Sequence, residues 1–362
     1  TTWNVDYGPQ GFTPGTGTST VATATTLSLT GLTTYTSYDF YVQSDCGPDS
    51  SRLVGPTTFT VGAPLAGAYT IDSAIATGGT NFESFSVFAT AINTFGVSAA
   101  VDVSVAANTY NDQCSLGDFP GSSMTNTVTI DGNGAATLTH DKSIRNSTMT
   151  VEGTSWLTIK NMTIAATGGL DSWGIHLVDS AHHITIDSNV IQLPVGVTGD
   201  VAGIIGSNSE TSDAGSGNNA FDIVISNNSI TGGERGVSLY GSFTPAARNS
   251  GMTLTNNTFT DNDDNGIYLT GYDNVSVTGN VVNTPNNSGS DAMYVSDLEN
   301  FDISGNTCSG NDLGFDADDL NFDNTVVNNS TISNNMFIGN QIAGFRNKKS
   351  RTGTQRGFNF DN

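Results

Sequence analysis

A short pattern of alternating apolar and polar residues recurs along residues 157–346 and leaves few architectures open to the chain. Its first half reads apolar-x-apolar, two small polar residues, Asn, x, apolar, and it occupies residues 157–164, 184–191, 223–230, 252–259, 275–282, 301–308 and 330–337. Its second half is a small residue followed by apolar-x-apolar, and it begins at Gly174, Gly203, Gly236, Gly266, Ala292, Gly314 and Gly344. The two halves alternate, so each pair forms one repeat unit.

The repeat length of roughly 22 to 39 residues, filled only with short alternating strands, predicts a solenoid. No single turn of such a coil can bury its own apolar side, but stacked turns can. Alternation places Ile184 and Ile186 on one face of a strand and Thr185 on the other, and in-phase repetition stacks like residues about 4.8 Å apart. We therefore expect an all-β chain dominated by a parallel β-helix.

An asparagine recurs at one point of the repeat, and we expect these side chains to stack inside the coil. The members are Asn189, Asn228, Asn257, Asn280, Asn306 and Asn335, with Met162 at this point of the first copy. Stacked amides can bond the amides above and below them and the bent backbone beside them. The small residue before the second strand indicates a crowded turn, because Ala292 is accepted where a positive φ would favour Gly alone.

These repeats resemble the right-handed parallel β-helix repeats of pectate-lyase-like proteins. The resemblance implies that residues 101–362 form a right-handed parallel β-helix. That fold hosts lyases, hydrolases, phage tailspikes and non-catalytic surface proteins, so it leaves the activity open.

Residues 1–62 carry strands of a different kind, separated by Gly, Pro and Thr turns. The alternating segments are Trp3–Tyr7, Thr26–Thr30, Tyr38–Gln43 and Thr57–Val61, which predict a β-sandwich module. The stretch 29–42 resembles a fibronectin type III domain, with Tyr38 at that family's corner tyrosine and residues 3–7 matching its third strand. The resemblance implies that two strands are missing in front and that Cys46 has lost its partner with them, so we expect the chain to be part of a longer one.

Residues 63–100 are predicted to be a linker and the N-terminal cap of the coil. Apolar residues at Phe85, Phe88, Ala89, Ile92 and Phe95 fall on one helical stripe that stops at Gly96. The open apolar end of a β-helix must be covered, and this helix is expected to cover it. Residues 66–110 and 117–121 resemble the opening of β-helix proteins exported by the type IX secretion route. That resemblance implies a secreted or cell-surface location.

The charge balance limits the partners of the chain. It has 11 Lys and Arg against 34 Asp and Glu, a net charge of −23, so nucleic acid is not an expected partner. No run of about 18 apolar residues exists, and we expect no transmembrane segment. The expected partners are an extracellular polysaccharide or cell-surface components. Cys46, Cys114 and Cys308 share no metal-ligand spacing, and Cys308 takes an interior apolar position.

The outward positions of the second strand are the candidate ligand-binding surface. The predicted residues are His176, Ser238, Tyr240, Tyr268, Tyr294, Asp316 and Asp318. Tyr268 and Tyr294 lie on successive turns and form an aromatic strip with polar neighbours, the combination that stacks on sugar rings and bonds their hydroxyls. Alternatively, tyrosines simply stack well on an exposed sheet. Insertions at 196–200, 208–220, 241–250 and 284–290 are expected to gather on one side, either as a binding edge or as tolerated surface loops.

Acidic residues near the C-terminal end support an alternative, enzymatic interpretation. Its candidate residues are Asp316, Asp318, Asp319 and Arg346. A glycoside hydrolase needs one acid and one base or nucleophile, and a lyase needs a base and a cation. Pectinase-like hydrolases carry an Asp-Asp pair on such a strand, but we assign no counterpart to their Gly-His-Gly and Arg-x-Lys motifs. We therefore expect a non-catalytic protein for adhesion, glycan contact or surface architecture, with a polysaccharide lyase or glycoside hydrolase as the alternative.

Asp261, Asp263 and Asn265 match the first half of a calcium loop, in which alternating oxygens surround the ion and Gly266 makes the turn. Position 12 of the loop is Tyr272 instead of Glu, so the motif is incomplete. The segment also agrees with an ordinary turn between strands. Calcium is thus the only cofactor that the sequence suggests.

Overall fold

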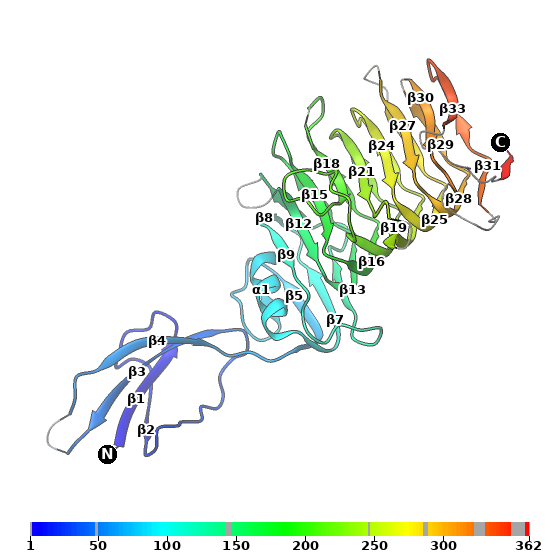
Figure 1. Cartoon of the computed structure of the whole chain (residues 1–362). Coiled ribbons are helices and arrows are strands. Elements are labelled where there is room, and N and C mark those ends of the chain that lie inside the picture. Colours follow the sequence, from blue (N-terminus) through cyan, green and yellow to red (C-terminus); the bar gives the residue numbers. More distant parts are fainter. Residues whose placement is uncertain are drawn as a thin grey trace.

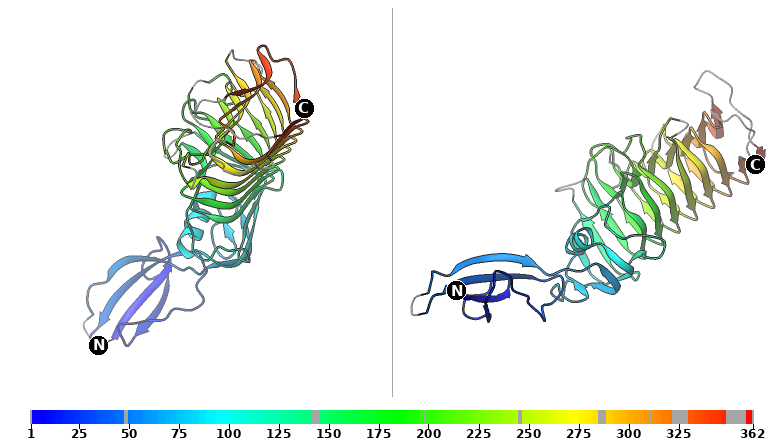
Figure 2. Two further views of the ribbon diagram at one scale, coloured as in Figure 1. Left: turned by 45° about the vertical axis from the view of Figure 1, so that its right-hand side comes forward. Right: turned by 60° about the horizontal axis from the view of Figure 1, so that its bottom comes forward.

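The computed structural model describes residues 2–47, 50–141, 146–197, 199–244, 247–284, 289–310, 312–321 and 330–348, and the backbone of 359–361. A small antiparallel sheet at the N-terminus precedes a long coil of parallel strands, and one helix lies at the start of the coil (Figure 1). The turns of the coil stack along one axis (Figure 2). This agrees with the predicted right-handed parallel β-helix with an N-terminal cap.

The N-terminal sheet is antiparallel. Its strands, in spatial order, are β2 (Thr18–Ala22), β1 (Thr2–Pro9), β3 (Ser37–Asp45) and β4 (Val54–Thr60). The predicted strand Thr26–Thr30 is wrong, because Thr18–Ala22 pairs with β1 instead. Leu27 and Leu29 lie over the apolar face of the sheet, where they line a groove of about 640 Å³ with Trp3 and Phe40. Packing on this face, and not strand pairing, accounts for their apolar character.

The coil has three sheets, here called sheets I, II and III. Sheet I contains β5 (Leu65–Ile71), β6 (Asn81–Phe82), β7 (Val97–Val105), β10 (Val128–Asp131), β13 (Ser155–Lys160), β16 (Ala181–Asp187), β19 (Ala220–Ser226), β22 (Asn249–Thr255), β25 (Tyr272–Thr278), β28 (Glu299–Ser304), β31 (Thr331–Ser333) and β34 (Asn359–Asp361). Sheet II contains β8 (Thr109–Asn111), β11 (Thr137–His140), β14 (Thr163–Ala166), β17 (Val190–Gln192), β20 (Ser229–Thr231), β23 (Thr258–Thr260), β26 (Val281–Thr284), β29 (Thr307–Gly310) and β32 (Met336–Phe337). Sheet III contains β9 (Cys114–Leu116), β12 (Ser147–Glu152), β15 (Trp173–Val178), β18 (Ala202–Gly206), β21 (Arg235–Tyr240), β24 (Asn265–Thr270), β27 (Asp291–Ser296), β30 (Leu313–Asp318) and β33 (Ala343–Lys348).

Helix α1 (Phe85–Phe95) covers the N-terminal end of the coil. It begins after Ser84, whose side chain accepts a hydrogen bond from the backbone N–H of Val87 at 3.3 Å. Such a cap satisfies a donor that the first turn would leave free. Phe85, Phe88 and Ile92 are fully buried against the first turns of the coil. The predicted capping helix is therefore confirmed.

The repeat places like residues above like, as the sequence indicated. Ile184 pairs with Leu157 on one side and with Ile223 on the other, and all three side chains are buried. The asparagines of the repeat are buried too, and the Nδ2 of each donates to the Oδ1 of the next from Asn189 to Asn335. The predicted interior asparagine ladder is confirmed.

The small residues at the start of the second strand pack against backbone. A Cβ on Gly174 would lie 2.5 Å from the carbonyl oxygen of Gly203, and one on Gly203 would lie 2.5 Å from that of Gly236. These glycines do not have a positive φ. Close packing is thus the reason for their size, as predicted.

The helices in the described part of the chain include none that is long and apolar enough to cross a membrane.

Candidate functional site

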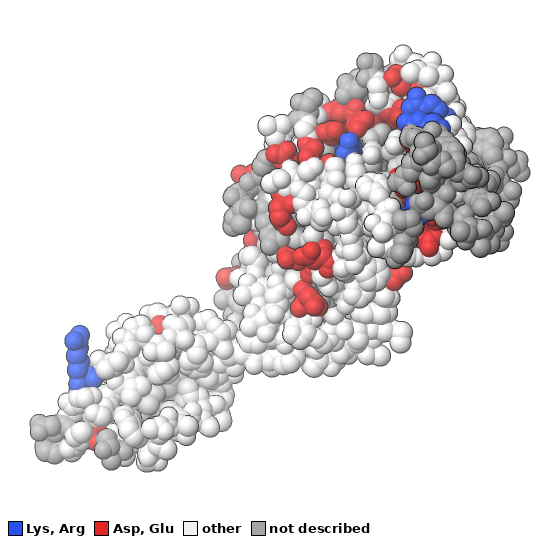
Figure 3. All heavy atoms as spheres, viewed as in Figure 1, with Lys and Arg blue, Asp and Glu red and all other residues white. Residues whose placement is uncertain are grey.

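The outer face of sheet III carries the side chains that the sequence analysis selected. Strand pairing aligns His176, Ile205, Ser238, Tyr268, Tyr294, Asp316 and Arg346 in one column. It aligns Tyr240, Thr270, Ser296, Asp318 and Lys348 in the next. Acidic side chains gather along this part of the coil, and a basic patch lies at its C-terminal end (Figure 3). The face therefore concentrates polar chemistry over several successive turns.

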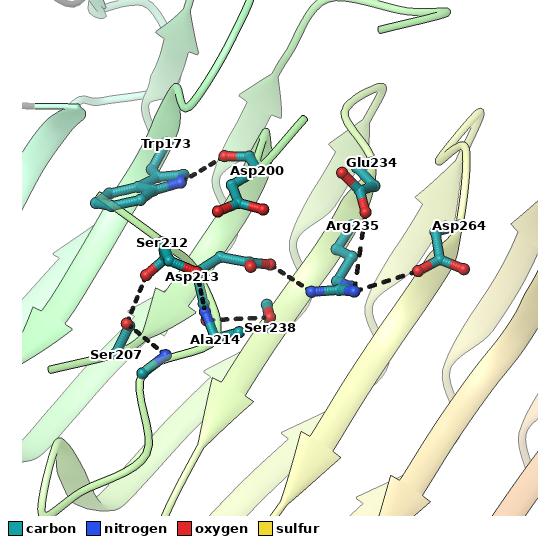
Figure 4. Close-up of polar contacts among 11 residues, drawn as sticks. Trp173, Asp200, Ser207, Ser212, Asp213, Ala214, Glu234, Arg235, Ser238 and Asp264 are labelled. Carbon is teal, nitrogen blue, oxygen red and sulfur yellow. Dashed lines mark hydrogen bonds and ion pairs between the residues drawn. The ribbon is translucent and has the colours of Figure 1, made fainter. Parts of the chain in front are cut away.

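A loop formed by residues 207–219 lies over the N-terminal half of this face. His176 contacts the carbonyl oxygen of Ser207 through Nε2 at 2.7 Å. Ser238 donates to the carbonyl oxygen of Asp213 at 3.4 Å (Figure 4). Both side chains are buried, with 1% and 0% of their surface exposed. The expectation that His176 and Ser238 contact a ligand is corrected, because the loop carbonyls occupy their polar atoms.

The same loop delivers a carboxylate to Arg235, which lies at the start of β21. The guanidinium is 2.7 Å from Asp213, 3.3 Å from Asp264 and 3.8 Å from Glu234 (Figure 4). Its central carbon also lies 4.7 Å from the ring centre of Tyr268, within range of a cation–π interaction. This arginine links the loop, two turns of the coil and the aromatic strip.

Burial shifts the titration of the acids around Arg235. It raises the pKa of Glu234, although Arg235 opposes the shift, and it raises the pKa of Asp264 against the same opposition. Burial also disfavours the charged guanidinium, but Asp213 and the neighbouring groups keep the pKa of Arg235 above its ordinary value. One positive charge therefore faces more negative charge than it can neutralise.

Asp291 is a further carboxylate on this face. Burial and the nearby Asp316 raise its pKa to about 6, while Arg346 acts in the opposite direction. The side chain is half-buried. Perturbed carboxylates of this kind are enriched in functional sites, although structural clusters perturb titration as well.

The sequence analysis missed Glu234, Arg235, Asp264 and Asp291. A signal for them does exist. They occupy the two positions before the small residue that opens the second half of the repeat, and these positions pair on successive turns. The second half of the repeat, as its sequence pattern defines it, begins at the small residue, so these two positions lie just outside the pattern.

The three tyrosines of the face stack on one another. The rings of Tyr240 and Tyr268 have centroids 5.0 Å apart and are inclined by 17°, and those of Tyr268 and Tyr294 are 4.8 Å apart and inclined by 20°. Both faces of Tyr268 are therefore covered, and Lys348 lies 5.5 Å from the ring centre of Tyr294. The stacked neighbours leave the edge and hydroxyl of Tyr268 as the parts open to a ligand, and the sugar-stacking surface stays a prediction. Burial raises the pKa of Tyr294 to about 12, so its hydroxyl stays neutral near pH 7.

The candidate catalytic acids lie at the C-terminal end of the face. Asp316 accepts hydrogen bonds from Arg346 at 3.0 Å and 2.6 Å, and Lys348 lies 3.2 Å away. Asp316 and the neighbouring Asp318 and Asp319 are all buried. Both oxygens of Asp316 are thus already engaged in charge-assisted bonds.

One of the two pectinase-like motifs that were expected to have no counterpart is present in the chain. Residues 346–348 read Arg-Asn-Lys, so an Arg-x-Lys sequence is present and lies beside Asp316. The Gly-His-Gly motif still has no counterpart in the sequence. Part of the pectinase-like set is therefore present without its histidine.

Asp261 and Asp263 lie in the turn between β23 and β24, and Asn265 is the first residue of β24. The backbone N–H of Asp263 donates to Gly233, and Nδ2 of Asn265 donates to the carbonyl of Asp291 at 2.8 Å. Among the residues that the structure describes, no group of three or more His, Cys, Asp or Glu side chains could hold a metal ion. The calcium site stays a prediction, because its expected ligands include an amide oxygen.

Comparison with known proteins places the coil in a family. Residues 147–355, more than half of the chain, match the family described as right handed beta helix region. No curated protein matches the sequence.

Several solved structures are similar to the chain. Pectate lyase Pel9A is 11% identical, with a TM-score of 0.43, over 82% of this chain and 79% of that one. The enzymatically active domain of bacteriophage CBA120 tailspike protein 2 is 13% identical, with a TM-score of 0.41, over 78% and 43%. The Yersinia enterocolitica family 28 exopolygalacturonase is 12% identical, with a TM-score of 0.33, over 92% and 84%. Similarity at this level carries no information about substrate.

Proposed function

Because the chain belongs to the right-handed β-helix family, we propose that it is a non-catalytic, secreted or cell-surface protein that contacts a polysaccharide with the outer face of sheet III. The proposal rests on the hydrogen bonds and the burial of Asp316. Its oxygens are held by Arg346 and Lys348, and the side chain is only 1% exposed. A carboxylate in that position stabilises the face and is poorly placed to exchange protons with a substrate.

The remaining groups of the face suit recognition of a carbohydrate. Tyr240, Tyr268 and Tyr294 are half-buried and present phenol edges, and carboxylates flank them on successive turns. Sugars offer many hydroxyls, which pair with planar polar side chains and phenol hydroxyls. The ligand would lie along the axis of the coil and cross several turns.

The N-terminal sheet supports the proposed role at a surface. The hydroxyl of Tyr38 accepts a hydrogen bond from the backbone N–H of Thr33 at 3.1 Å, the contact expected of a corner tyrosine in a fibronectin-like module. We propose that this module and export by the type IX route present the coil outside the cell. Tyr35 contacts Tyr69 and Phe82 of the first turns, so the module packs on the capped end and leaves sheet III free.

A glycoside hydrolase or lyase is the second candidate, and one observation favours it. Asp291 has a pKa raised to about 6, and the Arg346-x-Lys348 sequence lies on the same face. A carboxylate with such a pKa can donate a proton near neutral pH. Asp291 would act as the general acid, and Asp318 or Asp319 would act as the base.

A glycan panel with matched variants separates the two candidates. Changing Tyr268→Phe and Tyr294→Phe together keeps the stacked rings and removes two hydroxyls. Retention on the preferred polysaccharide should fall about tenfold or more. Tyr41→Phe, in the N-terminal sheet, is the control and should change nothing.

Turnover assays complete the comparison. The parent protein should release neither reducing ends nor unsaturated sugars from any polysaccharide in the panel. Release that disappears in Asp291→Asn or Asp318→Asn would establish the enzyme and reject the binding role. Retention equal in the parent and the double tyrosine variant would place the ligand elsewhere.

A further inference from the structure

Three carboxylates lie where the strands of sheet III begin on successive turns, and they form what is here called the carboxylate row: Glu234 and Asp264, each just before its strand, and Asp291, the first residue of β27. Register pairs Arg235 with Asn265, so Glu234 and Asp264 stand on adjacent turns at the same level. Asp291 follows one turn later and one residue further along the strand direction, since Ile267 pairs with Met293 and Asp291 is therefore level with Asn265. Adjacent turns of a parallel coil are about 4.8 Å apart. A polymer that runs along the axis of the coil therefore meets the three carboxylates in succession.

The carboxylate row has too little positive charge around it. Arg235 contacts Glu234 and Asp264, but it is also 2.7 Å from Asp213. The pKa of each carboxyl in the row is raised, with burial as the main cause in every case. Arg235 offsets part of the negative charge at Glu234 and Asp264, and Arg346 offsets part of it at Asp291, but burial still raises the pKa of all three carboxyls.

Two buried atoms beside the row have hydrogen-bonding capacity to spare. Oδ1 of Asp213 and Nε of Arg235 are buried without a hydrogen-bond partner among the described residues. The Asp213 side chain is 2% exposed. Buried polar atoms of this kind normally have partners. Oδ1 of Asp213 is an acceptor with room for one more donor at this end of the row, whereas Nε of Arg235 is itself a donor.

We propose that the carboxylate row binds the protonated amino groups of an amino-sugar polymer, with one ammonium per turn; this rests on the proposed function of the face. An ammonium donates a charge-assisted hydrogen bond to each carboxylate that it meets. The carboxylates of a uronate polymer would instead lie beside Glu234, Asp264 and Asp291, and the like charges would repel one another. The face thereby prefers amino sugars and rejects polyuronates along the row.

A divalent cation is the other positive charge that could occupy the row. In the described part of the chain no set of His, Cys, Asp and Glu side chains is close enough to ligate a metal ion. Ammonium groups do not need such convergence, because each can pair with one carboxylate. The spacing along the coil therefore favours a polymer over a single ion.

The test compares three oligosaccharides of equal length by titration calorimetry in chelator, at a mildly acidic pH that keeps the sugar amines protonated: glucosamine, N-acetylglucosamine and galacturonate oligomers. The glucosamine oligomer should bind at least about tenfold more tightly than the N-acetylated one, because acetylation removes each charge. Asp264→Asn with Asp291→Asn should abolish most of that preference. Asp302→Asn is the control, since it removes the same kind of charge from the exposed outer face of sheet I.

Each outcome has a distinct meaning. Equal binding of the glucosamine and N-acetylglucosamine oligomers, still lost in the double tyrosine variant, overturns the amino-sugar proposal and keeps the glycan-binding function. Binding of galacturonate in chelator, or only when calcium is added, overturns the proposal in favour of a uronate ligand. Equal losses in the row variant and in Asp302→Asn would assign the preference to overall charge. If no oligosaccharide binds to the folded parent, both the proposal and the function fail.

Discussion

Asn257 donates from both its side-chain Nδ2 and its backbone N–H to the same atom, Oδ1 of Asn280, at 3.0 Å in each case. The Nδ2 also donates to the carbonyl of Ile225 at 2.8 Å. The pattern repeats one turn earlier, where Asn228 donates twice to Asn257. The side chain of Asn257 thus satisfies the N–H of Asn228 and the carbonyl of Ile225 on the preceding turn, and its own backbone N–H is satisfied by the asparagine of the next turn.

Replacing Asn257 with Leu should lower the free energy of unfolding by about 3 kcal/mol or more, because buried donors of Asn228 lose their acceptor. Urea unfolding followed by circular dichroism measures the change. The matched control is Asn283→Leu, at an exposed position of sheet II on the next turn. A loss below about 0.5 kcal/mol at Asn257, as expected for the exposed control, would contradict the ladder's role.

The residue before each of the six interior asparagines, and before Met162 in the first copy of the repeat, adopts a left-handed backbone conformation. The members are Asn161, Ser188, Asn227, Asn256, Gly279, Gly305 and Asn334, with φ between 53° and 67°. A β-branched residue is strained there, so Asn256→Val should destabilise the fold by about 1 to 2 kcal/mol, whereas Asn256→Gly should be close to neutral. Thermal unfolding of the two variants checks the sign. Equal stability of both would show that the turn tolerates another conformation.

Asp291→Asn should stabilise the protein near neutral pH and not in acid. The folded-state pKa is raised from 3.8 to about 6, so the ionised group costs stability once the pH exceeds its unfolded value. The loss of unfolding free energy caused by ionising Asp291 grows with pH up to about pH 6. Because the side chain is half-exposed, solvent limits this loss to about 1 kcal/mol. Melting temperatures at about pH 7 and about pH 4 measure it. A gain that persists unchanged at the lower pH would exclude this carboxyl as its origin.

The segment containing Asp261, Asp263 and Asn265 gives the calcium prediction. Calcium that binds only the folded protein must raise its melting temperature. The expected result is a higher temperature in millimolar calcium than in chelator, with the difference absent in Asp261→Asn with Asp263→Asn. Melting curves of the parent that superimpose in the two buffers would reject the site.

Much of the fold was predictable because its signal is local and repeated. Alternation at Ile184–Ile186 indicates one buried strand face by itself, and its recurrence on successive turns fixes the stacking of the turns. The asparagine ladder and the crowded glycine turn follow from the same repetition. The outward column that contains Tyr268 and Tyr294 was predictable for this reason as well.

The function of that column depended on contacts that no repeat encodes. The loop around Asp213 buries His176 and Ser238 and reaches Arg235, because an insertion's path is set by what it meets in three dimensions. Packing likewise decided the strand order of the N-terminal sheet. Thr18–Ala22 pairs with β1, where the sequence pattern had favoured Thr26–Thr30.

The sequence by itself determined the coil, its interior and the order of side chains along each sheet, since these depend on periodicity and on groups one turn apart. Tertiary structure alone decided which of those side chains remain accessible and how they titrate. The raised pKa of Asp291 results from burial and from Asp316 on a neighbouring turn, and the covered faces of Tyr268 result from the rings on either side. Solvent exclusion and charge proximity are properties of the assembled surface, and the order of residues does not contain them.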